Sequence, residues 1–385
     1  MFYSLNQLFV KNIIGCNSIL FIFIYIIMNS LQCINSSYNN KKSSNNKITF
    51  TTFTNITANI TDLSFNKISF IAGSGQSQPS TSNLGTYSLF YGTYLISYLY
   101  QSSNTATTFN RTTFATGSLI STAMSENGLY QYFTLTNSNV YISSNSGSTF
   151  SIITVNNTQQ LRSIDCSSDG KYVILTGRAS TASADYYIGL STNYGNTFST
   201  IKGNLPTANI SNECTIGCIS DDGNTIYVCI PGTSGGIFKS TNALSGSITY
   251  TNVYPTTTAI FRASMSYDGT YAIFATNLST TQLYYTTNGG ISFSILNPVS
   301  SSYVSSVSMD KTGQYCMATG YISNTLYYWN NYLSSSYNTA TIPLGQYGFT
   351  CCISPDATVG YVMYGTTNYP PSFPTTNLNY LYKIT

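Results

Sequence analysis

Short apolar runs rich in β-branched and aromatic residues recur along the body of the chain and are separated by polar turn residues. Residues 162–201 illustrate one unit, in which an Asp-Gly turn and an Asn-Tyr-Gly turn help to separate four such runs. The runs are Arg162–Cys166, Lys171–Thr176, Tyr186–Leu190 and Thr197–Ile201. Runs of β-branched and aromatic residues bounded by such turns predict strands joined by hairpins. No window of about 11 to 18 residues in the body of the chain shows a helical apolar period, so we expect an all-β body.

Two sequence signatures recur at intervals of about 42 to 53 residues. The first is Ser-x-Asp, usually followed by Gly, at Ser167-Ser168-Asp169-Gly170, Ser220-Asp221-Asp222-Gly223, Ser266-Tyr267-Asp268-Gly269, Ser308-Met309-Asp310 and Ser354-Pro355-Asp356, with a weaker copy at Ser125-Glu126-Asn127-Gly128. The second is [Ser/Thr]-x-Asn-x-Gly-x-[Ser/Thr]-Phe, at Ser143 to Phe150, Ser191 to Phe198 and Thr286 to Phe293. Self-similarity at this period indicates a solenoid or a propeller, because one repeat cannot bury its own apolar face.

The polar residues of both signatures are interpreted as turn-forming residues rather than as a ligand site. Asp, Asn and Ser side chains bond back to a turn backbone, and Gly takes the positive φ that such turns need. This structural role is assigned to Asp169, Asp222, Asp268, Asp310, Asp356, Asn145, Asn193 and Asn288.

Four strands per repeat, named A to D in chain order, correspond to one blade of a propeller. Strand A is expected to begin near Lys67, Leu119, Arg162, Cys214, Arg262, Val304 and Phe349, which gives seven blades. The last repeat ends one strand short, and Ile48–Thr54 has the pattern of the other D strands. We therefore predict an all-β, seven-bladed β-propeller whose last blade is completed by the N-terminal strand, so that the ring is closed.

The second signature resembles the Asp-box, or BNR repeat, Ser-x-Asp-x-Gly-x-Thr-Trp. Here Asn145, Asn193 and Asn288 stand in place of Asp, and Phe150, Phe198 and Phe293 in place of Trp. Propellers with this repeat include sialidases, sortilin-type receptors and photosystem II assembly factors. The resemblance covers roughly residues 47–385 and implies the fold, but this fold carries unrelated functions.

The N-terminus resembles a secretory leader. The apolar run of residues 19–28 follows Lys11, and residues 35–47 are polar. A run this short after a basic residue fits a signal peptide better than a full membrane span, with an uncleaved signal anchor as the alternative. We expect a leader at 1–33, a polar linker at 34–46 and the propeller at 47–385. The protein is therefore expected to be secreted or displayed on an extracellular surface, or else membrane-anchored or on a virion surface.

Charge is scarce along the whole chain. Only 6% of the residues are charged and the net charge is +3, without a basic cluster in the body of the chain. The phosphate-binding component of a nucleic-acid protein is therefore missing, and we expect no nucleic-acid partner. An uncharged exterior is consistent with an extracellular or virion surface.

Cysteine and histidine usage limits the chemistry. There is no histidine and no Cys-x-x-Cys spacing, so we expect no metal and no cofactor. Seven cysteines follow the leader, an odd number, and free core thiols are favoured. One disulfide between Cys214 and Cys229 is the alternative. The lack of histidine also removes the usual general base and the Ser-His-Asp arrangement.

Candidate ligand-binding residues are the few charged and aromatic residues placed outside the turns. Arg162 and Arg262 are expected to open A strands, and Arg178 to lie in a B-to-C connection, so that all three point to one face. Arginine is preferred for carboxylate recognition. The carboxylates Asp165, Asp185 and Glu213 are expected near the same face, where Tyr254, Tyr303 and Tyr347 would supply exposed rings for stacking on sugars.

The sequence thus favours a non-enzymatic propeller that binds a glycan or a protein partner on the face formed by the D-to-A and B-to-C connections. Two alternatives stay open. One is a glycoside hydrolase of sialidase type, which needs two carboxylates at one site. The other is a structural component of a surface or virion exterior.

Overall fold

The computed structural model describes residues 48, 53–55, 80–94, 96–106, 109–114, 119–135, 138–155, 159–179, 186–207, 214–276, 282–296, 304–320, 323–342, 347–365 and 379–384. They belong to a compact unit that spans residues 48–385. The described strands form seven four-stranded antiparallel sheets. This part of the chain contains one short 3-10 segment, η3 (Asn83–Gly85), and no α-helix. The predicted leader and linker lie outside the described residues.

The first four blades follow the chain in order. Blade 1 comprises β2 (Ser80–Thr81), β3 (Ser88–Tyr94), β4 (Ile96–Ser102) and β5 (Asn110–Phe114). Blade 2 comprises β6 (Leu119–Met124), β7 (Gln131–Leu135), β8 (Asn139–Ser143) and β9 (Ser151–Thr154). Blade 3 comprises β10 (Gln159–Cys166), β11 (Val173–Ala179), β12 (Tyr186–Ser191) and β13 (Ser199–Thr200). Blade 4 comprises β14 (Ile216–Ile219), β15 (Ile226–Ile230), β16 (Gly236–Ser240) and β17 (Thr251–Pro255).

The last three blades bring the chain back to its first strand. Blade 5 comprises β18 (Ile260–Met265), β19 (Ala272–Thr276), β20 (Leu283–Thr286) and β21 (Ser294–Leu296). Blade 6 comprises β22 (Val304–Met309), β23 (Cys316–Gly320), β24 (Thr325–Trp329) and β25 (Asn338–Thr341). Blade 7 comprises β26 (Tyr347–Ile353), β27 (Gly360–Gly365), β28 (Asn379–Ile384) and β1 (Phe53–Asn55).

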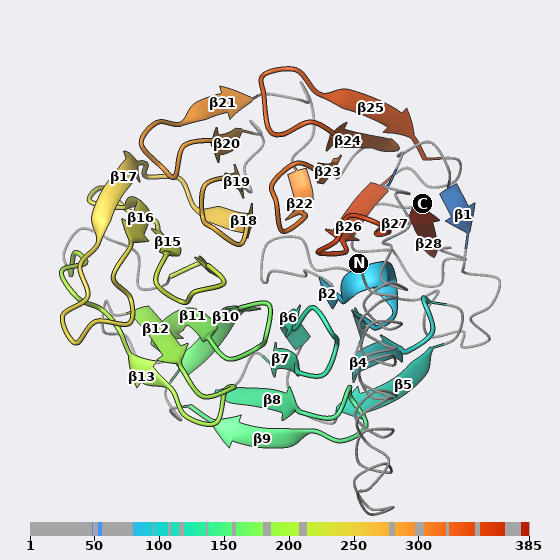
Figure 1. Ribbon diagram of the computed structural model, residues 1–385, viewed down its shortest axis with the longest axis horizontal. Helices are drawn as coiled ribbons and strands as arrows, with labels where there is room; N and C mark the ends of the chain where they lie inside the picture. Colours follow the sequence, from blue (N-terminus) through green and yellow to red (C-terminus); the bar gives the residue numbers. More distant parts are fainter. Residues whose placement is uncertain are drawn as a thin grey trace, which may run out of the picture. The chain divides into compact units, whose positions relative to one another are not determined.

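The seven sheets stand around a common centre, with strand A of each blade innermost and strand D outermost (Figure 1). The prediction of an all-β, seven-bladed propeller is therefore confirmed. The N-terminal strand does complete the last blade, because Thr54 of β1 pairs with Lys383 of β28. The described part of this strand is Phe53–Asn55, and Ile48 lies outside the described strands. Ile48 itself is buried and donates its backbone N–H to the Ala357 carbonyl at 3.0 Å.

Blade 1 departs from the prediction in its first strand. The expected start near Lys67 lies outside the described residues, and the innermost strand of this sheet is β2, only two residues long. The next turn, Ser82 to Gly85, is a copy of the first signature in which Leu84 takes the place of Asp. Ser82 Oγ accepts the Tyr87 N–H at 2.9 Å, and Gly85 has a φ of +64°. This copy escaped the sequence pattern because it lacks the acidic residue.

The first signature joins strands A and B, and these turns are called the A–B turns. In blade 3, the Ser167 hydroxyl donates to Asp169 at 2.7 Å and accepts the Tyr172 N–H at 3.0 Å. Asp169 also accepts the Lys171 N–H at 2.8 Å, and Gly170 has a φ of +78°. The side chains thus replace backbone partners that a tight turn leaves open.

The A–B turn of blade 6 has a different register from the predicted one. Ser308 and Asp310 were matched to Ser-x-Asp, but the turn is Asp310 to Gly313. Asp310 occupies the serine position: its carboxylate accepts the Tyr315 N–H at 2.7 Å and the Thr312 hydroxyl at 2.6 Å. Ser308 instead accepts the Ile353 N–H of the neighbouring blade at 3.0 Å. Ser308 lies two residues before Asp310 and therefore matched the Ser-x-Asp pattern, so the predicted register of this turn is wrong.

The second signature joins strands C and D, and these turns are called the C–D turns. Asn145 accepts the Ser143 hydroxyl at 2.9 Å and the Thr149 N–H at 3.0 Å, while its amide donates to Thr149 Oγ1 at 2.8 Å. The same contacts recur around Asn193 and Asn288. An asparagine therefore makes all the turn contacts without adding a charge.

The core lies between neighbouring blades rather than at the centre of the ring. One cluster joins Tyr132 and Ile142 of blade 2 to Leu161, Val173 and Leu175 of blade 3. On the turn side, the glycine of one A–B turn lies against the ring of the tyrosine that follows the preceding A–B turn. This contact joins Gly128 to Tyr87, Gly170 to Tyr130, Gly223 to Tyr172 and Gly313 to Tyr271. Glycine is thus needed for its φ and for the close approach.

Candidate functional site

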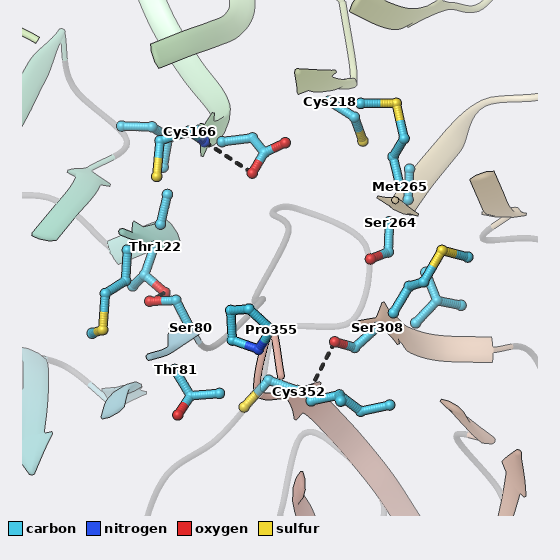
Figure 2. A pocket seen from close by; sticks show the side chains of 18 of the residues that line it. Ser80, Thr81, Thr122, Cys166, Cys218, Ser264, Met265, Ser308, Cys352 and Pro355 are labelled. Atoms are coloured by element: carbon cyan, nitrogen blue, oxygen red, sulfur yellow. Dashed lines mark hydrogen bonds between the residues drawn. The ribbon is translucent and has the colours of Figure 1, made fainter. Parts of the chain in front are cut away.

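A cavity of about 140 Å³ lies at the centre of the ring, between the innermost strands (Figure 1). All seven A strands line it, together with two A–B turn residues, Tyr267 and Pro355. Figure 2 shows these side chains around the central space, with Thr122, Ser80 and Thr81 on one side and Ser264 and Met265 on another. The cavity exists because seven innermost strands leave a channel that their side chains only partly fill.

Hydroxyl, thioether and thiol groups dominate the lining. Thr122 donates its hydroxyl to Ser80 at 3.0 Å, and Ser308 accepts the Ile353 N–H at 3.0 Å. The sulfur-bearing residues are Met124, Met265, Met309, Cys166, Cys218, Cys351 and Cys352. The lining is therefore polar but almost uncharged, as the composition of the chain requires.

Asp165 contributes the one carboxylate among the cavity-lining residues. It is the next-to-last residue of β10, and its two oxygens accept the backbone N–H of Cys166 at 2.9 Å and that of Ile219, in blade 4, at 3.0 Å. Asp165 is half-buried and lines the cavity. Burial raises the pKa of Asp165 from 3.8 to about 6, although the two N–H bonds oppose this.

A series of hydrogen bonds connects neighbouring A–B turns beside the mouth of the cavity. It connects the second residue of successive A–B turns: Asn83 to Glu126, Glu126 to Ser168, Asp221 to Tyr267, Tyr267 to Lys311, and Lys311 to Pro355, at 2.8 to 3.1 Å. Between blades 3 and 4, the Ser168 N–H uses the Asp221 carboxylate instead, at 2.8 Å. The variable residue of Ser-x-Asp therefore connects neighbouring turns, and in blades 5 and 7 it also lines the cavity, which the sequence reasoning did not use.

An ion pair crosses this mouth from blade 6 to blade 2. Lys311 Nζ lies 3.1 Å from Glu126 Oε1, and Glu126 also accepts the Asn83 side-chain amide at 3.1 Å. Tyr267 lies beside them. Burial, and then the nearby Glu126, Cys166, Asp165 and Asp221, raise the pKa of Tyr267 well above its usual value. Carboxylates thus gather around the phenol at this end of the channel.

The cysteines at positions 166, 214, 218, 229, 316, 351 and 352 are all buried, and none of them forms a disulfide. Ile216, not Cys214, is the direct partner of Cys229 across the two strands, so the alternative of a Cys214–Cys229 disulfide is wrong. Burial raises the pKa of Cys166 and Cys218 well above the usual value and keeps these thiols neutral. Among the described residues, no group of three potential ligands could hold a metal ion.

Arg262, a predicted ligand-binding residue, is engaged within the propeller. Its Nε donates to the Ser305 carbonyl of blade 6 at 2.6 Å, and Nη1 donates to the Phe261 carbonyl at 2.9 Å. Its side chain is only 8% exposed. A ligand that used Arg262 would have to replace these bonds, which makes this arginine an inter-blade contact in the present arrangement.

Arg162 and Arg178 lie together in blade 3. Arg162 is the extra residue of a bulge in β10, and both arginines are half-buried. Arg178 was expected in the B-to-C connection but belongs to β11, where it pairs with Gln160. Its Nε is buried without a hydrogen-bond partner. The structure therefore brings these two arginines to one end of one blade, without Arg262.

The remaining candidates are three tyrosines and three carboxylates. Tyr254 lies in β17 rather than in a connection, and its ring packs against Tyr284 at 4.7 Å and Phe293 at 5.3 Å, between blades 4 and 5. Tyr347 is the first residue of β26. Asp185, Glu213 and Tyr303 lie outside the described residues. Asp165 was expected near the D-to-A face, but it lies at the A–B end because strand A runs toward that turn.

No family model and no curated protein sequence matches the chain. Solved structures do share its fold. Hydrazine synthase from Kuenenia stuttgartiensis has a TM-score of 0.59 and 14% identity, over 76% of this chain and 96% of that chain. The Cps50 (Swd1) β-propeller domain from Myceliophteria thermophila has a TM-score of 0.57 and 11% identity, over 80% and 97%. A chain of the Mitotic Checkpoint Complex has a TM-score of 0.59 and 13% identity, over 89% and 94%.

At these identities the likeness extends to the fold alone, a seven-bladed β-propeller. It gives no support to a particular repeat family, so the similarity of the C–D turns to the Asp-box stays a resemblance of motif. Among the described residues, no helix is both long and apolar enough to span a membrane.

Proposed function

We propose that the protein is a non-enzymatic scaffold that binds a protein partner on the face formed by the D-to-A and B-to-C connections. The observation that carries this proposal is that most of the described acidic residues hold turns and only one of them lines the cavity. The turn carboxylates of Asp169, Asp222, Asp268, Asp310 and Asp356 accept hydrogen bonds within their own A–B turns. Among the cavity-lining residues, Asp165 alone carries a carboxylate, whereas a glycoside hydrolase needs two at one site.

A protein partner is favoured over a glycan for two reasons. Two of the similar structures, a Cps50 (Swd1) propeller domain and a chain of the Mitotic Checkpoint Complex, carry names of proteins or assemblies rather than of carbohydrate-active enzymes. In addition, Arg262 and Tyr254, which would have recognised an acidic or neutral sugar, pack between blades. A glycan partner therefore has less support from these residues.

Site-specific photo-crosslinking tests the proposal. A photoreactive residue at Thr257, exposed between β17 and β18, reports on the D-to-A face; the matched control is Ser245, exposed in the C–D turn of the same blade. We expect discrete, saturable protein adducts from position 257 and none from position 245. Equal adducts from both positions, or saturable binding to one glycan class on an array without a protein adduct, would overturn it.

The proposal places this face outside the cell, in line with the predicted leader. Asn110, in the sequon Asn110-Arg111-Thr112, is exposed on the outer strand β5 and is open to a glycosyltransferase. Expression in a secretory host should give a band that shifts on endoglycosidase treatment, and Thr112→Ala should remove one glycan. An unglycosylated intracellular protein would contradict this placement.

A second candidate, a structural component of a surface exterior, rests on the circumference of the ring. The outer strands β1, β9, β13, β17, β21 and β25 contain no charged residue; only β5 has one, Arg111. Charged residues normally prevent outer strands from pairing with another chain. Their scarcity here is compatible with lateral association.

A further inference from the structure

The A–B end of the channel carries negative charge on a chain whose net charge is positive. Asp165 lines the cavity, and Glu126 and Asp221 lie with it near the Tyr267 phenol. Among the second residues of the A–B turns, Lys311 is the cation, and it is paired with Glu126. Three carboxylates thus face one ammonium, while the whole chain has a net charge of +3. A mouth of this sign attracts cations from solution.

Asp165 lines the cavity and keeps unused hydrogen-bonding capacity. Each of its oxygens accepts one backbone N–H, whereas a carboxylate has about four lone-pair positions. Ser264 and Tyr267, which both carry hydroxyl groups, line the same cavity, and no lysine or arginine does. A half-buried carboxylate with no cationic side chain among the cavity-lining residues is a suitable counter-ion for a bound cation.

The volume and the lining limit the size and type of that cation. A cavity of about 140 Å³ is close to the engineered cavity of about 150 Å³ that holds benzene, so it accommodates about six non-hydrogen atoms. The thioethers of Met124, Met265 and Met309 offer apolar, polarisable surface beside the hydroxyls. Together these groups suit an ammonium head with a short alkyl chain.

We propose that the central cavity is a binding site for a primary alkylammonium of about five or six non-hydrogen atoms, whose charged head pairs with Asp165. Glu126 and Asp221 draw the cation to the mouth, and the hydroxyls of the lining accept its second and third hydrogen bonds. The ligand is either a free small amine or the side chain of a lysine on a partner. Both present the same alkylammonium group.

No other titratable group facing Asp165 becomes a competing cation. Asp165 acts on the Cys166 and Cys218 thiols and on the Tyr267 phenol, and the carboxylates of Asp169, Asp221 and Glu126 lie near Cys166 or Tyr267. Burial raises the pKa of both thiols and of the phenol, so these groups stay neutral between pH 5 and pH 7.5. The affinity for a cation then follows the ionised fraction of Asp165, which falls as the pH drops through about 6.

Calorimetric titration of the full chain with n-butylammonium tests the site, with n-butanol as the uncharged ligand of the same length. We expect saturable binding of butylammonium and none of butanol, and at least a ten-fold loss in Asp165→Asn. The matched control is Asp169→Asn, an identical charge change on the same blade outside the cavity, which should leave the affinity unchanged. Equal binding of butanol, equal losses in the two variants, or equal displacement by potassium ions would overturn the proposal.

A measurement on the unmodified protein covers the case in which Asp165→Asn does not fold. Between pH 7.5 and pH 5, the affinity for butylammonium should fall about ten-fold, as the ionised fraction of a group with a pKa of about 6 does. Binding at pH 6 should release protons, seen as a dependence of the heat on the buffer. An affinity that does not vary with pH would exclude Asp165 as the partner of the ammonium group.

A second ligand distinguishes the two sources of the alkylammonium group. Binding of Nα-acetyl-lysine amide as well would identify the lysine side chain as a ligand, and binding of butylammonium alone would identify a free amine.

Discussion

At the scale of single residues, glycine and tyrosine hold neighbouring blades together on the turn side. A Cβ at Gly170 would lie 2.8 Å from the Tyr130 Cβ and 3.0 Å from its Cγ, and φ is +78°. An alanine there would be strained in its backbone and would push the ring away. The same residue type at Gly246 has no heavy atom within 4 Å and no positive φ.

Gly170→Ala is therefore expected to lower the free energy of unfolding by about 2 to 4 kcal/mol, through the positive φ and the overpacking together. Gly246→Ala should change it by less than about 1 kcal/mol. Urea unfolding followed by tyrosine fluorescence measures both. Equal urea midpoints for the two variants would mean that the turn at Gly170 accommodates the added Cβ without a loss of stability.

Asp165 makes a separate residue-scale prediction about pH. Because its folded-state pKa is raised from 3.8 to about 6, the folded protein binds its proton more tightly than the unfolded chain does. Its contribution to stability is present below about pH 4 and is lost as the pH rises through about 6, by at most about 3 kcal/mol. Asp222 has a lowered pKa, chiefly because of the Ser220 hydroxyl, and acts in the opposite direction.

Urea unfolding of the wild type and of Asp165→Asn between pH 4 and pH 7 isolates this contribution, since Asp222 is common to both. The free energy of unfolding of the wild type should fall relative to the variant as the pH rises. A constant difference would show that Asp165 is more hydrated than its position implies.

At the scale of strands and turns, ring closure depends on the register of β1 against β28. Thr54 pairs with Lys383, and a shift of one residue would move each side chain to the other face. We expect Thr54→Cys/Lys383→Cys to form a disulfide and to stabilise the fold by about 2 to 4 kcal/mol. Thr54→Cys/Ile384→Cys, one residue out of register, should stay reduced. Mass spectrometry and thermal unfolding without reductant decide between them.

The turns show how far the sequence could predict the fold. Local chemistry repeats in every blade, so the turn residues and the pattern of short strands were enough to count seven blades and to pair the first strand with the last. Blade 1 was harder, because Leu84 replaces the acidic residue and β2 has only two residues. In blade 6, Ser308 and Asp310 imitated the motif while Asp310 held the serine position.

The site was less predictable, because it depends on residues far apart in the chain. Glu126 and Lys311 meet across the mouth although 185 positions separate them, and no local pattern marks either one. Arg162 and Arg262 both follow D-to-A connections, yet Arg262 is turned into the contact with blade 6. The direction of strand A, which places Asp165 at the turn end, could have been read from the sequence.

At the scale of the whole molecule, the circumference of the ring is almost uncharged. Ile152 in β9 is 53% exposed and Ile291 in the C–D turn of blade 5 is 87% exposed, among outer strands of Ser, Thr and Asn. Little electrostatic repulsion opposes contact between copies. Weak lateral association is therefore expected at high concentration and near the pI of about 8.2.

Ile152→Lys and Ile291→Lys should each reduce this association, measured by sedimentation velocity over a concentration series. Neither substitution should change the free energy of unfolding, measured in urea, by more than about 0.5 kcal/mol. Thr257→Lys, on the D-to-A face, is the control of equal charge. If that control reduces association as strongly, net charge rather than the outer edge is responsible.

The pairing of β1 with β28 also imposes an order of events during synthesis. The two strands are made more than 300 residues apart, so at about 5 to 20 residues per second the first strand waits roughly 15 to 60 s for its partner. Blades 1 to 6 can form in succession while β1 is held without its neighbour, and blade 7 can be completed only when β28 leaves the ribosome. A nascent chain stalled before residue 379 would therefore carry six finished blades and two unpaired edges, a form that a chaperone could recognise and that a released chain would not show.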